Sequence, residues 1–247
     1  MADRAPKVIF CIPTVTKPYQ QCLDSLAASN PLIHAAGWEE GMGNSIGNPY
    51  ISMARQTMLT KAMRAGADVI VFIDHDLSWD SDALLKLIET EGDVVAGTYR
   101  FKKEEEEYMG AVLPDIHGRP QVRDDGCVLA HCVPAGFLKV TRAAVNRFTL
   151  TYPELMYTDD GTLTVDLFNH GAHKGVWYGE DYAFSRRWNE LGGQIWIIPD
   201  LNITHHTVKD SFPGNYHQYL LRRPGGSESD CPVPPDQLTL PVLNRVA

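Results

Sequence analysis

The sequence predicts a single α/β domain in which a Rossmann-like parallel sheet half is joined to a mixed-sheet half. Segments typical of strands and helices alternate along the first 100 residues. The run at 69–73 is apolar throughout, which is typical of a strand covered on both faces. Later segments are short and separated by Gly and Pro. The expected boundaries are 1–222 for the domain, 1–100 and 101–222 for its halves, and 223–247 for a weakly structured tail.

Composition limits the classes of function. A length of 247 residues suits one large domain, and a formal net charge of −9 argues against nonspecific binding to nucleic acid. The five cysteines form no C-x-x-C pair and their number is odd, which fits a reducing compartment. No apolar segment is long enough for a signal peptide or a membrane span. We therefore expect a protein of the cytoplasm, or of the host cytoplasm if it is viral.

The first half is expected to open with a βα unit. Residues 7–12 are mostly apolar and should form a strand that ends at Pro13, and residues 18–28 carry the spacing of a short helix. Such an alternation implies parallel strands with right-handed crossovers. The remaining elements are expected in this order: a Gly- and Asn-rich loop over 39–49, a helix over 50–65 that ends at Gly66, the strand at 69–73, a helix over 80–90 and a strand over 93–97.

In the second half the expected elements are shorter. Gly and Pro interrupt residues 108–140, so we expect short strands there, the last over 137–140 and leading into a helix over 141–148. Residues 151–178 are aromatic and contain Gly, and they should form an irregular loop that faces a substrate. A helix over 180–191 and strands over 194–198 and 201–206 complete the core.

Two carboxylates follow the apolar strand directly. Asp74 and Asp76 stand one residue apart at its end, and ligand sites in parallel sheets lie beyond the carboxyl ends of the strands. Carboxylate oxygens suit Mg²⁺ and Mn²⁺, which keep part of their shell for water and substrate phosphate. The alternative is a strand followed by a helix cap, although Ser78, Asp80 and Ser81 can cap that helix without help from the acid pair.

A second acid pair begins the predicted helix over 180–191. Glu180 and Asp181 lie in its first turn, where the helix dipole by itself favours negative charge. The segment before them, Trp177-Tyr178-Gly179, is aromatic and contains Gly. It would give one carboxylate a partly apolar pocket, which raises the pKa and suits a general base.

Two histidines end the last predicted strand. Successive strand residues point to opposite faces, so only one of His205 and His206 can share a site with the aspartates. A neutral imidazole is a common metal ligand. The alternative is a histidine that is hydrogen-bonded at the surface or in the core.

Taken together and in this order, these signals resemble GT-A glycosyltransferases of the family-2-like and viral or phage type. The resemblance extends over about residues 7–207 and includes segments beside the acids and the late histidine. The segments that carry it are the strand over 8–13, Ala54-Arg55-Gln56, Asp74-His75-Asp76, the strand over 93–99, Ala135-Gly136-Phe137, Gly179-Glu180-Asp181 and His205.

The resemblance implies a GT-A fold with a nucleotide-binding half and an acceptor half, and it assigns roles to the donor-site residues. Mn²⁺ or Mg²⁺ would be held at a metal site of Asp74, Asp76 and His205. In that site Asp76 would be the main ligand, and Asp74 would lie nearer the ribose or a metal-bound water. Pro13 and Thr14 would line the nucleotide pocket.

The implied reaction moves a sugar from a nucleotide diphosphate, with a UDP-sugar favoured, to an acceptor hydroxyl. A divalent cation offsets the charge that builds on the departing phosphate, and Arg55 and Lys102 or Lys103 could add fixed positive charge nearby. If the reaction inverts the anomeric centre, Asp181 matches the base best, with Glu180 second.

Two positions depart from the family pattern. Gln56 stands where relatives often have asparagine, which leaves the donor contact open. His206 and Thr207 stand where a glycine often closes the histidine motif, which leaves open which histidine binds metal.

Other classes of function remain as alternatives. A nucleotidyltransferase would usually carry a Gly-rich phosphate loop near the first strand, and residues 11–16 contain no glycine. A non-catalytic nucleotide- or carbohydrate-binding module could keep the fold and the metal. For the transferase the expected acceptor is a glycan, with a hydroxymethylated base of phage-type DNA as second choice because the chain is acidic.

Overall fold

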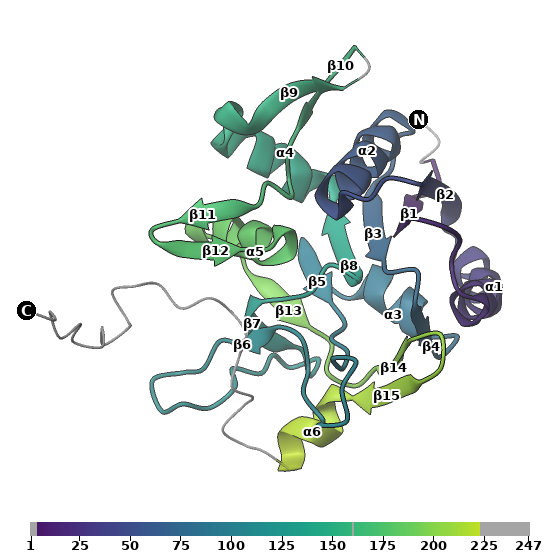
Figure 1. Ribbon diagram of the computed structural model, residues 1–247, viewed down its shortest axis with the longest axis vertical. Helices are drawn as coiled ribbons and strands as arrows, with labels where there is room; N and C mark the ends of the chain where they lie inside the picture. Colours follow the sequence, from purple (N-terminus) through teal and green to yellow (C-terminus); the bar gives the residue numbers. More distant parts are fainter. Residues whose placement is uncertain (1–3, 160, 223–247) are drawn as a thin grey trace, which may run out of the picture.

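The structure, a computed structural model that describes residues 4–159 and 161–222, is built around a mixed sheet of eight strands (Figure 1). The two strands at one edge are the N-terminal ones, and the strands at the other edge come from the middle of the chain. In spatial order they are β2 (Glu39–Ile46), β1 (Lys7–Thr14), β3 (Val69–Ile73), β8 (Phe137–Thr141), β5 (Val94–Ala96), β13 (Ile195–Ile197), β7 (Val128–Cys132) and β6 (Ala111–Val112).

The strand directions confirm an α/β fold with a parallel part and a mixed part. β1 pairs in parallel with both β2 and β3, and β13 pairs in parallel with β5. The expectation of one continuous parallel sheet over the first hundred residues is wrong, because β8 lies between β3 and β5 and is antiparallel to both. Its Val140 pairs with Ile70 on one side and Val94 on the other, so a strand from the second half fills the centre.

The first two strands also differ from expectation. β1 does not end at Pro13 but continues to Thr14. Its pairing with β3 stops at Cys11, so Pro13 pairs with β2 only. A proline is tolerated in a strand where no neighbouring strand requires a hydrogen bond from its backbone nitrogen. The loop expected over 39–49 is wrong: most of it is β2, a Gly-rich edge strand whose residues follow the β1 backbone. Tertiary pairing overrides local strand propensity here.

Helices cover both faces of the sheet, and alternate residues of β1 point to the two sides. Ile9 and Cys11 join the core under α2 (Ile51–Arg64), α4 (Arg142–Thr151) and α5 (Glu180–Glu190). Val8 and Phe10 join the core under α1 (Gln20–Ala35) and α3 (Ala83–Glu89). The first helix is longer than the predicted 18–28 and contains Pro31. None of the helices in the described ranges is long and apolar enough to cross a membrane.

The irregular loop expected over 151–178 is wrong as well. After a short 3₁₀ turn, η1 (Pro153–Leu155), it forms two antiparallel hairpins. The second has the two-residue loop Lys174-Gly175, and both residues have positive φ, 47° and 81°. Such a pair matches the twist of a tight hairpin. The hairpin strands are β9 (Met156–Asp159), β10 (Thr162–Val165), β11 (Gly171–His173) and β12 (Val176–Tyr178).

A small second sheet carries the late histidines. Its order is β15 (Ser211–Asn215), β14 (Asn202–His206) and β4 (Leu77–Trp79), and α6 (Tyr216–Arg222) follows it. β4 begins directly after the aspartates, and its Leu77 pairs with His205. The small sheet therefore brings His205 beside the acid pair. The tail expected over 223–247 lies outside the described residues.

Candidate functional site

The candidate site lies at the carboxyl end of β3. All five residues of this strand are buried, and the Asp74 backbone N–H donates to the Gly136 carbonyl at 2.8 Å just before β8 begins. The chain then turns, with a bond from the Leu77 N–H to the Asp74 carbonyl at 3.2 Å. Asp74 and Asp76 thus leave the sheet at the edge where β5 also ends, as the sequence predicts for an acid pair after a buried strand.

The Asp74 carboxylate is held by two buried groups. Its Oδ1 accepts from Arg55 Nη2 at 2.6 Å, and its Oδ2 accepts from the Tyr99 hydroxyl at 3.0 Å. Burial raises the pKa of Tyr99, so this hydroxyl keeps its proton and donates it. Asp74 is therefore fixed in place by protein donors on both oxygens.

Gly136 makes this arrangement possible. A Cβ atom at this position would overlap the Tyr99 hydroxyl oxygen and the Asp74 carboxylate, with the Asp74 Cγ only 2.6 Å away. Only glycine lets the backbone come so close to the bonded pair. The Ala135-Gly136-Phe137 segment thus has a steric role at the site. The sequence shows the glycine, but only the structure shows why a larger residue would not fit there.

Arg55 lies at the centre of the charged groups. It is 3% exposed and comes from α2, with Nη2 on Asp74 and Nη1 on Glu180 of α5. Burial lowers the pKa of the guanidinium, but the charges of these two acids outweigh burial and raise it above its ordinary value. Both terminal nitrogens are bonded to carboxylates, so Arg55 acts here as a link between α2, β3 and α5.

Asp76 faces a lysine and a histidine. Its Oδ2 bonds the Lys102 ammonium group, and its Oδ1 faces His205 Nε2 at 3.6 Å. Burial raises the pKa of the Asp76 carboxyl, but His205 and Lys102 outweigh burial and hold it below its ordinary range. Asp76 is thus a charged carboxylate that is 8% exposed.

The two histidines have clearly different surroundings. His205 Nδ1 donates to the Arg100 carbonyl at 2.8 Å, so its Nε2 carries a lone pair toward Asp76 in the neutral ring. In His206, both ring nitrogens face hydroxyls, Ser78 Oγ at 2.7 Å and Ser211 Oγ at 2.8 Å. Of the two, His205 is therefore the one whose Nε2, in the neutral ring, could bind a ligand near Asp76.

Asp181 lies in the first turn of α5, beside the Glu180 that pairs with Arg55. It is partly buried, and its Oδ1 accepts from the Tyr182 N–H at 2.8 Å. Burial, followed by the charge of Glu180, raises the pKa of Asp181 to about 7, and Arg55 offsets part of this shift. A carboxylate with such a pKa can take a proton near neutral pH.

The predicted nucleotide-pocket residues lie at the end of β1. Pro13 and Thr14 are both buried there, next to the strand that delivers the aspartates. The Thr14 hydroxyl is buried and has no hydrogen-bond partner within the described part of the chain. A buried hydroxyl without a partner is costly, so this position suits a polar group of a ligand.

The donor atoms around Asp76 fit a divalent cation. A carboxylate oxygen suits Mg²⁺ and Mn²⁺, and a neutral imidazole nitrogen is a common metal ligand. Within residues 4–159 and 161–222 no three acidic, histidine or cysteine side chains are already grouped around one point. Asp76 and His205 could thus supply two ligands to an ion that keeps positions for water and phosphate.

Some residues of the cluster were not predicted from the sequence. The sequence places Tyr99 only at the end of the expected strand over 93–99, and it does not indicate the bond from its hydroxyl to Asp74. The Arg100 carbonyl, which fixes His205, was missed because a backbone acceptor leaves no sequence signal. Tyr99 could have been found by the rule that groups at the carboxyl ends of neighbouring strands meet.

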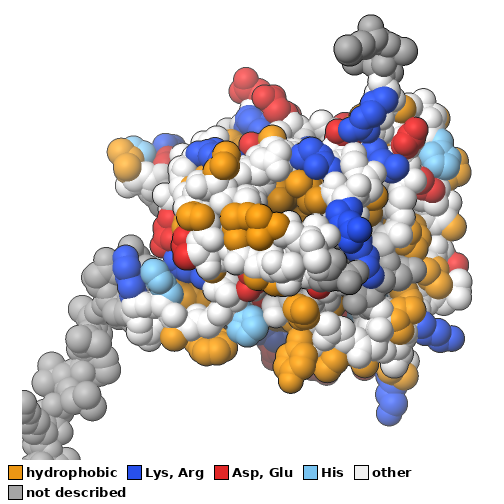
Figure 2. All heavy atoms as spheres, turned by 90° about the horizontal axis from the view of Figure 1, so that it is seen from above, with side chains coloured by type: hydrophobic (Ala, Val, Ile, Leu, Met, Phe, Trp, Pro, Cys, Tyr) orange, Lys and Arg blue, Asp and Glu red, His pale blue; other side chains and the backbone are white. Residues whose placement is uncertain are grey.

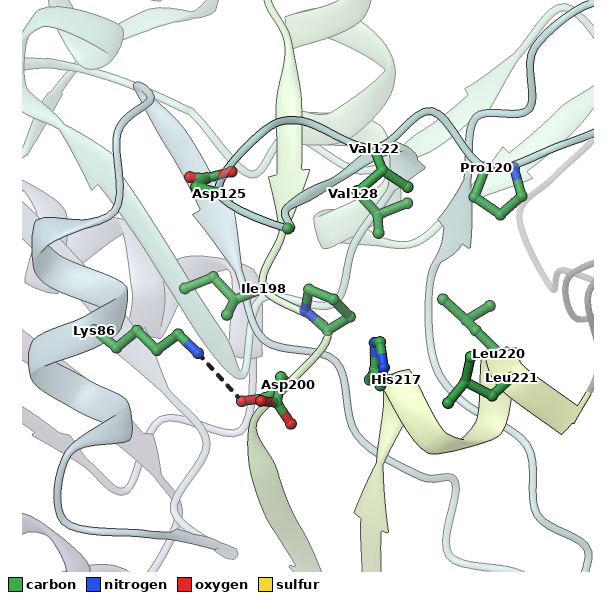
Figure 3. Close-up of a pocket in the computed structure, with 12 residues that line it drawn as sticks. Lys86, Pro120, Val122, Asp125, Val128, Ile198, Asp200, His217, Leu220 and Leu221 are labelled. Atoms are coloured by element: carbon green, nitrogen blue, oxygen red, sulfur yellow. Dashed lines mark hydrogen bonds between the residues drawn. The ribbon is translucent and has the colours of Figure 1, made fainter.

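A separate hollow of about 480 Å³ shares no residue with this cluster (Figure 3). It lies between the residues after β13, helix α6 and the segment before β7, and Figure 3 shows Lys86 pointing toward Asp200 at its rim. Its walls are largely apolar. The predicted site residues therefore do not line this hollow.

Comparison with known proteins gives structural likenesses only. No family model matches the sequence, and no curated protein matches it. The fold is similar to A197 from STIV, with 14% identity, a TM-score of 0.46 and coverage of 85% of this chain and 94% of that one. It is also similar to GalNAc-T7 with UDP, GalNAc and Mn²⁺, with 9% identity, a TM-score of 0.47 and coverage of 83% and 44%.

A third similar structure is Drosophila beta-1,4-galactosyltransferase 7 in complex with manganese, UDP-Gal and xylobiose. The identity is 14% and the TM-score 0.40, and the alignment covers 89% of this chain and 74% of that one. Likenesses this distant do not establish a function. The function is therefore argued from the site.

Proposed function

We propose that the protein is a metal-dependent glycosyltransferase of the GT-A type that uses a nucleotide-sugar donor, with a UDP-sugar favoured. The observation that carries the proposal is that the carboxylates of Asp74 and Asp76 have different partners. Asp74 is fixed by Arg55 and Tyr99, whereas Asp76 faces a histidine nitrogen that can bind a metal when the ring is neutral. If the two aspartates only followed a strand and capped a helix, there would be no reason for their carboxylates to have such different partners.

In this proposal, Asp76 and His205 would hold Mn²⁺ or Mg²⁺ for the diphosphate of the donor. When bound, the ion would act as a Lewis acid that offsets the negative charge on the departing diphosphate. Asp74 retains lone pairs on both oxygens and can accept from a ribose hydroxyl or from a metal-bound water. The buried Thr14 hydroxyl, beside Pro13, gives the nucleotide a polar partner.

The transfer itself is assigned to Asp181. The acceptor oxygen forms a bond to the anomeric carbon, the bond from that carbon to the diphosphate oxygen breaks, and the diphosphate keeps the electron pair. Asp181 takes the acceptor proton, for which a pKa of about 7 is suitable. Glu180 is the weaker candidate for the base because its carboxylate is already paired with Arg55. A base of this kind fits an inverting reaction.

The preferred acceptor is a glycan, and a modified DNA base is the second choice. A net charge of −9 disfavours a polyanion. Figure 2 shows hydrophobic side chains gathered in patches on one face, with basic side chains among them. Exposed apolar residues include Met42, Ile46, Tyr50, Leu163 and Trp177. Tyrosine and tryptophan offer flat surfaces that a neutral sugar ring can cover.

The test combines turnover with binding. The protein is incubated with a panel of nucleotide sugars and Mn²⁺, and released nucleoside diphosphate is measured; we expect release with a UDP-sugar. UDP with Mn²⁺ should raise the melting temperature of the wild type but not of Asp76→Ala. Asp82→Ala is the matched control, because Asp82 is an exposed acid on the same segment.

Three results would redirect the proposal. Release of pyrophosphate from a nucleoside triphosphate would point to a nucleotidyltransferase. Full transferase turnover by Asp181→Asn would exclude base catalysis by Asp181. Binding of UDP without turnover on any donor, with Asp76 still required, would identify a non-catalytic binding module.

A further inference from the structure

Lys102 lies on the carboxylate that the proposed metal needs. Its ammonium group bonds Asp76 Oδ2, while Asp76 Oδ1 faces His205 Nε2. The Lys102 side chain is 34% exposed and the Asp76 side chain only 11%, so the lysine lies between the acid and solvent. One oxygen of the main proposed metal ligand is therefore already paired with a cation of the protein itself.

The position of Lys102 is set by a closed backbone turn. Arg100 and Tyr108 pair as an antiparallel bridge at its base, and the Phe101 N–H donates to the Glu107 carbonyl at 3.0 Å. The Arg100 guanidinium also donates to a carbonyl of the turn, that of Glu104, at 2.9 Å. These bonds define the path of the turn that delivers the lysine to Asp76.

The same turn is bonded to the histidine of the site. Arg100 begins the turn, and its carbonyl accepts from His205 Nδ1 at 2.8 Å. The tautomer that directs the His205 lone pair toward Asp76 is thus fixed by the segment that carries Lys102. The lysine and the histidine reach Asp76 from one connected unit.

We propose that Lys102 is an internal counter-ion that shares Asp76 with the divalent cation: it holds the carboxylate in the donor-free protein and moves to the donor diphosphate when the metal binds. The inference rests on the proposed function. An ion between Asp76 and His205 would lie close to the ammonium group and repel it. A diphosphate gives the lysine a new anionic partner in the same site. Metal and nucleotide therefore strengthen each other's binding.

Mn²⁺ binding to the full chain tests this exchange, measured by electron paramagnetic resonance of free Mn²⁺ with and without UDP. Without UDP, Lys102→Met should bind Mn²⁺ about tenfold more tightly than the wild type. UDP should raise the Mn²⁺ affinity of the variant less than that of the wild type. Lys103→Met is the matched control and should stay within about twofold of the wild type, because Lys103 pairs with Glu107 instead.

Each outcome separates the inference from the proposed function. Unchanged or weaker Mn²⁺ binding by Lys102→Met, while the wild type binds Mn²⁺ with UDP and Asp76→Ala does not, overturns the counter-ion role and leaves the metal site standing. No Mn²⁺ binding by the wild type even with UDP overturns both. Thermal unfolding checks that the variant is folded, and Lys102→Gln replaces it if Lys102→Met is not.

Discussion

Arg55 of α2 and Glu180 of α5 form a buried ion pair that joins the helix before the acid strand to the helix that carries Asp181. Because the other guanidinium nitrogen holds Asp74, one side chain sets the relative position of both acid pairs. The two acid pairs lie more than a hundred residues apart in the chain, and Arg55 bonds one acid of each pair.

Replacing Arg55 should therefore damage both the fold and the site. Arg55→Met leaves Asp74 and Glu180 without their buried counter-ion, which should cost about 3 to 5 kcal/mol in the free energy of unfolding. Urea denaturation measures the loss. Arg64→Met is the control, because Arg64 is an exposed residue in the last turn of the same helix, and it should change the stability by less than about 0.5 kcal/mol.

Gly136 should not tolerate even the smallest side chain. Gly136→Ala forces a Cβ against the Tyr99 hydroxyl and the Asp74 carboxylate, so we expect a loss of about 1 to 3 kcal/mol in stability and at least tenfold weaker binding of UDP with Mn²⁺. Gly43→Ala is the control, since its Cβ would find its nearest neighbour at 3.7 Å. Equal binding by Gly136→Ala and the wild type would mean that the Asp74 position does not matter for the ligand.

The parts of the fold that follow from local patterns were predicted well. β3 is a run of five apolar residues, α5 begins with two acids, and β14 ends in two histidines. Each of these signals depends on neighbours in sequence. β2 and the hairpin strands β9 to β12 were missed, because their residues become strands only through pairing with a partner strand.

The same distinction applies to the site. The sequence indicated which acids and histidines to consider, but the meeting of Asp76 with His205 depends on β4, a strand of three residues that pairs with β14. The choice between His205 and His206 depends on the Arg100 carbonyl and on two serine hydroxyls. Neither a backbone carbonyl that accepts a hydrogen bond nor the pairing of two short strands leaves a periodic pattern in the sequence. These contacts could therefore be identified only from the structure.

Neighbouring histidine substitutions should separate metal binding from stability. His205→Asn removes the nitrogen that faces Asp76, so binding of Mn²⁺ with UDP should weaken about 10- to 100-fold. His206→Asn breaks bonds to Ser78 and Ser211, and it should cost about 1 to 3 kcal/mol in stability while changing Mn²⁺ affinity by less than about threefold. Calorimetric titration and urea denaturation measure the two effects. The reverse pattern would reassign the ligand to His206.

The raised pKa of Asp181 predicts how turnover depends on pH. The ionised carboxylate is the form that takes the acceptor proton, so the rate should rise with pH and level off above about 7. Asp181→Asn should lower the rate at least a hundredfold and remove this rise. Nucleoside diphosphate release between about pH 5.5 and 8.5 provides the profile, because this range lies above the ordinary pKa values of Asp and Glu. A flat profile in the wild type would exclude Asp181 as the base.

The same group should make the folded protein less stable as pH rises. Its pKa moves from 3.8 to about 7 on folding, so the folded state favours the protonated form. The stabilisation is fully present below the unfolded pKa and is lost as pH rises through the folded one. Asp181→Asn, which stays neutral, should therefore be more stable than the wild type by about 1 to 3 kcal/mol above neutral pH, with a smaller difference in mild acid. Urea denaturation of both proteins on either side of neutrality measures this gap, and a gap that narrows with rising pH would show that burial does not oppose the charge on Asp181.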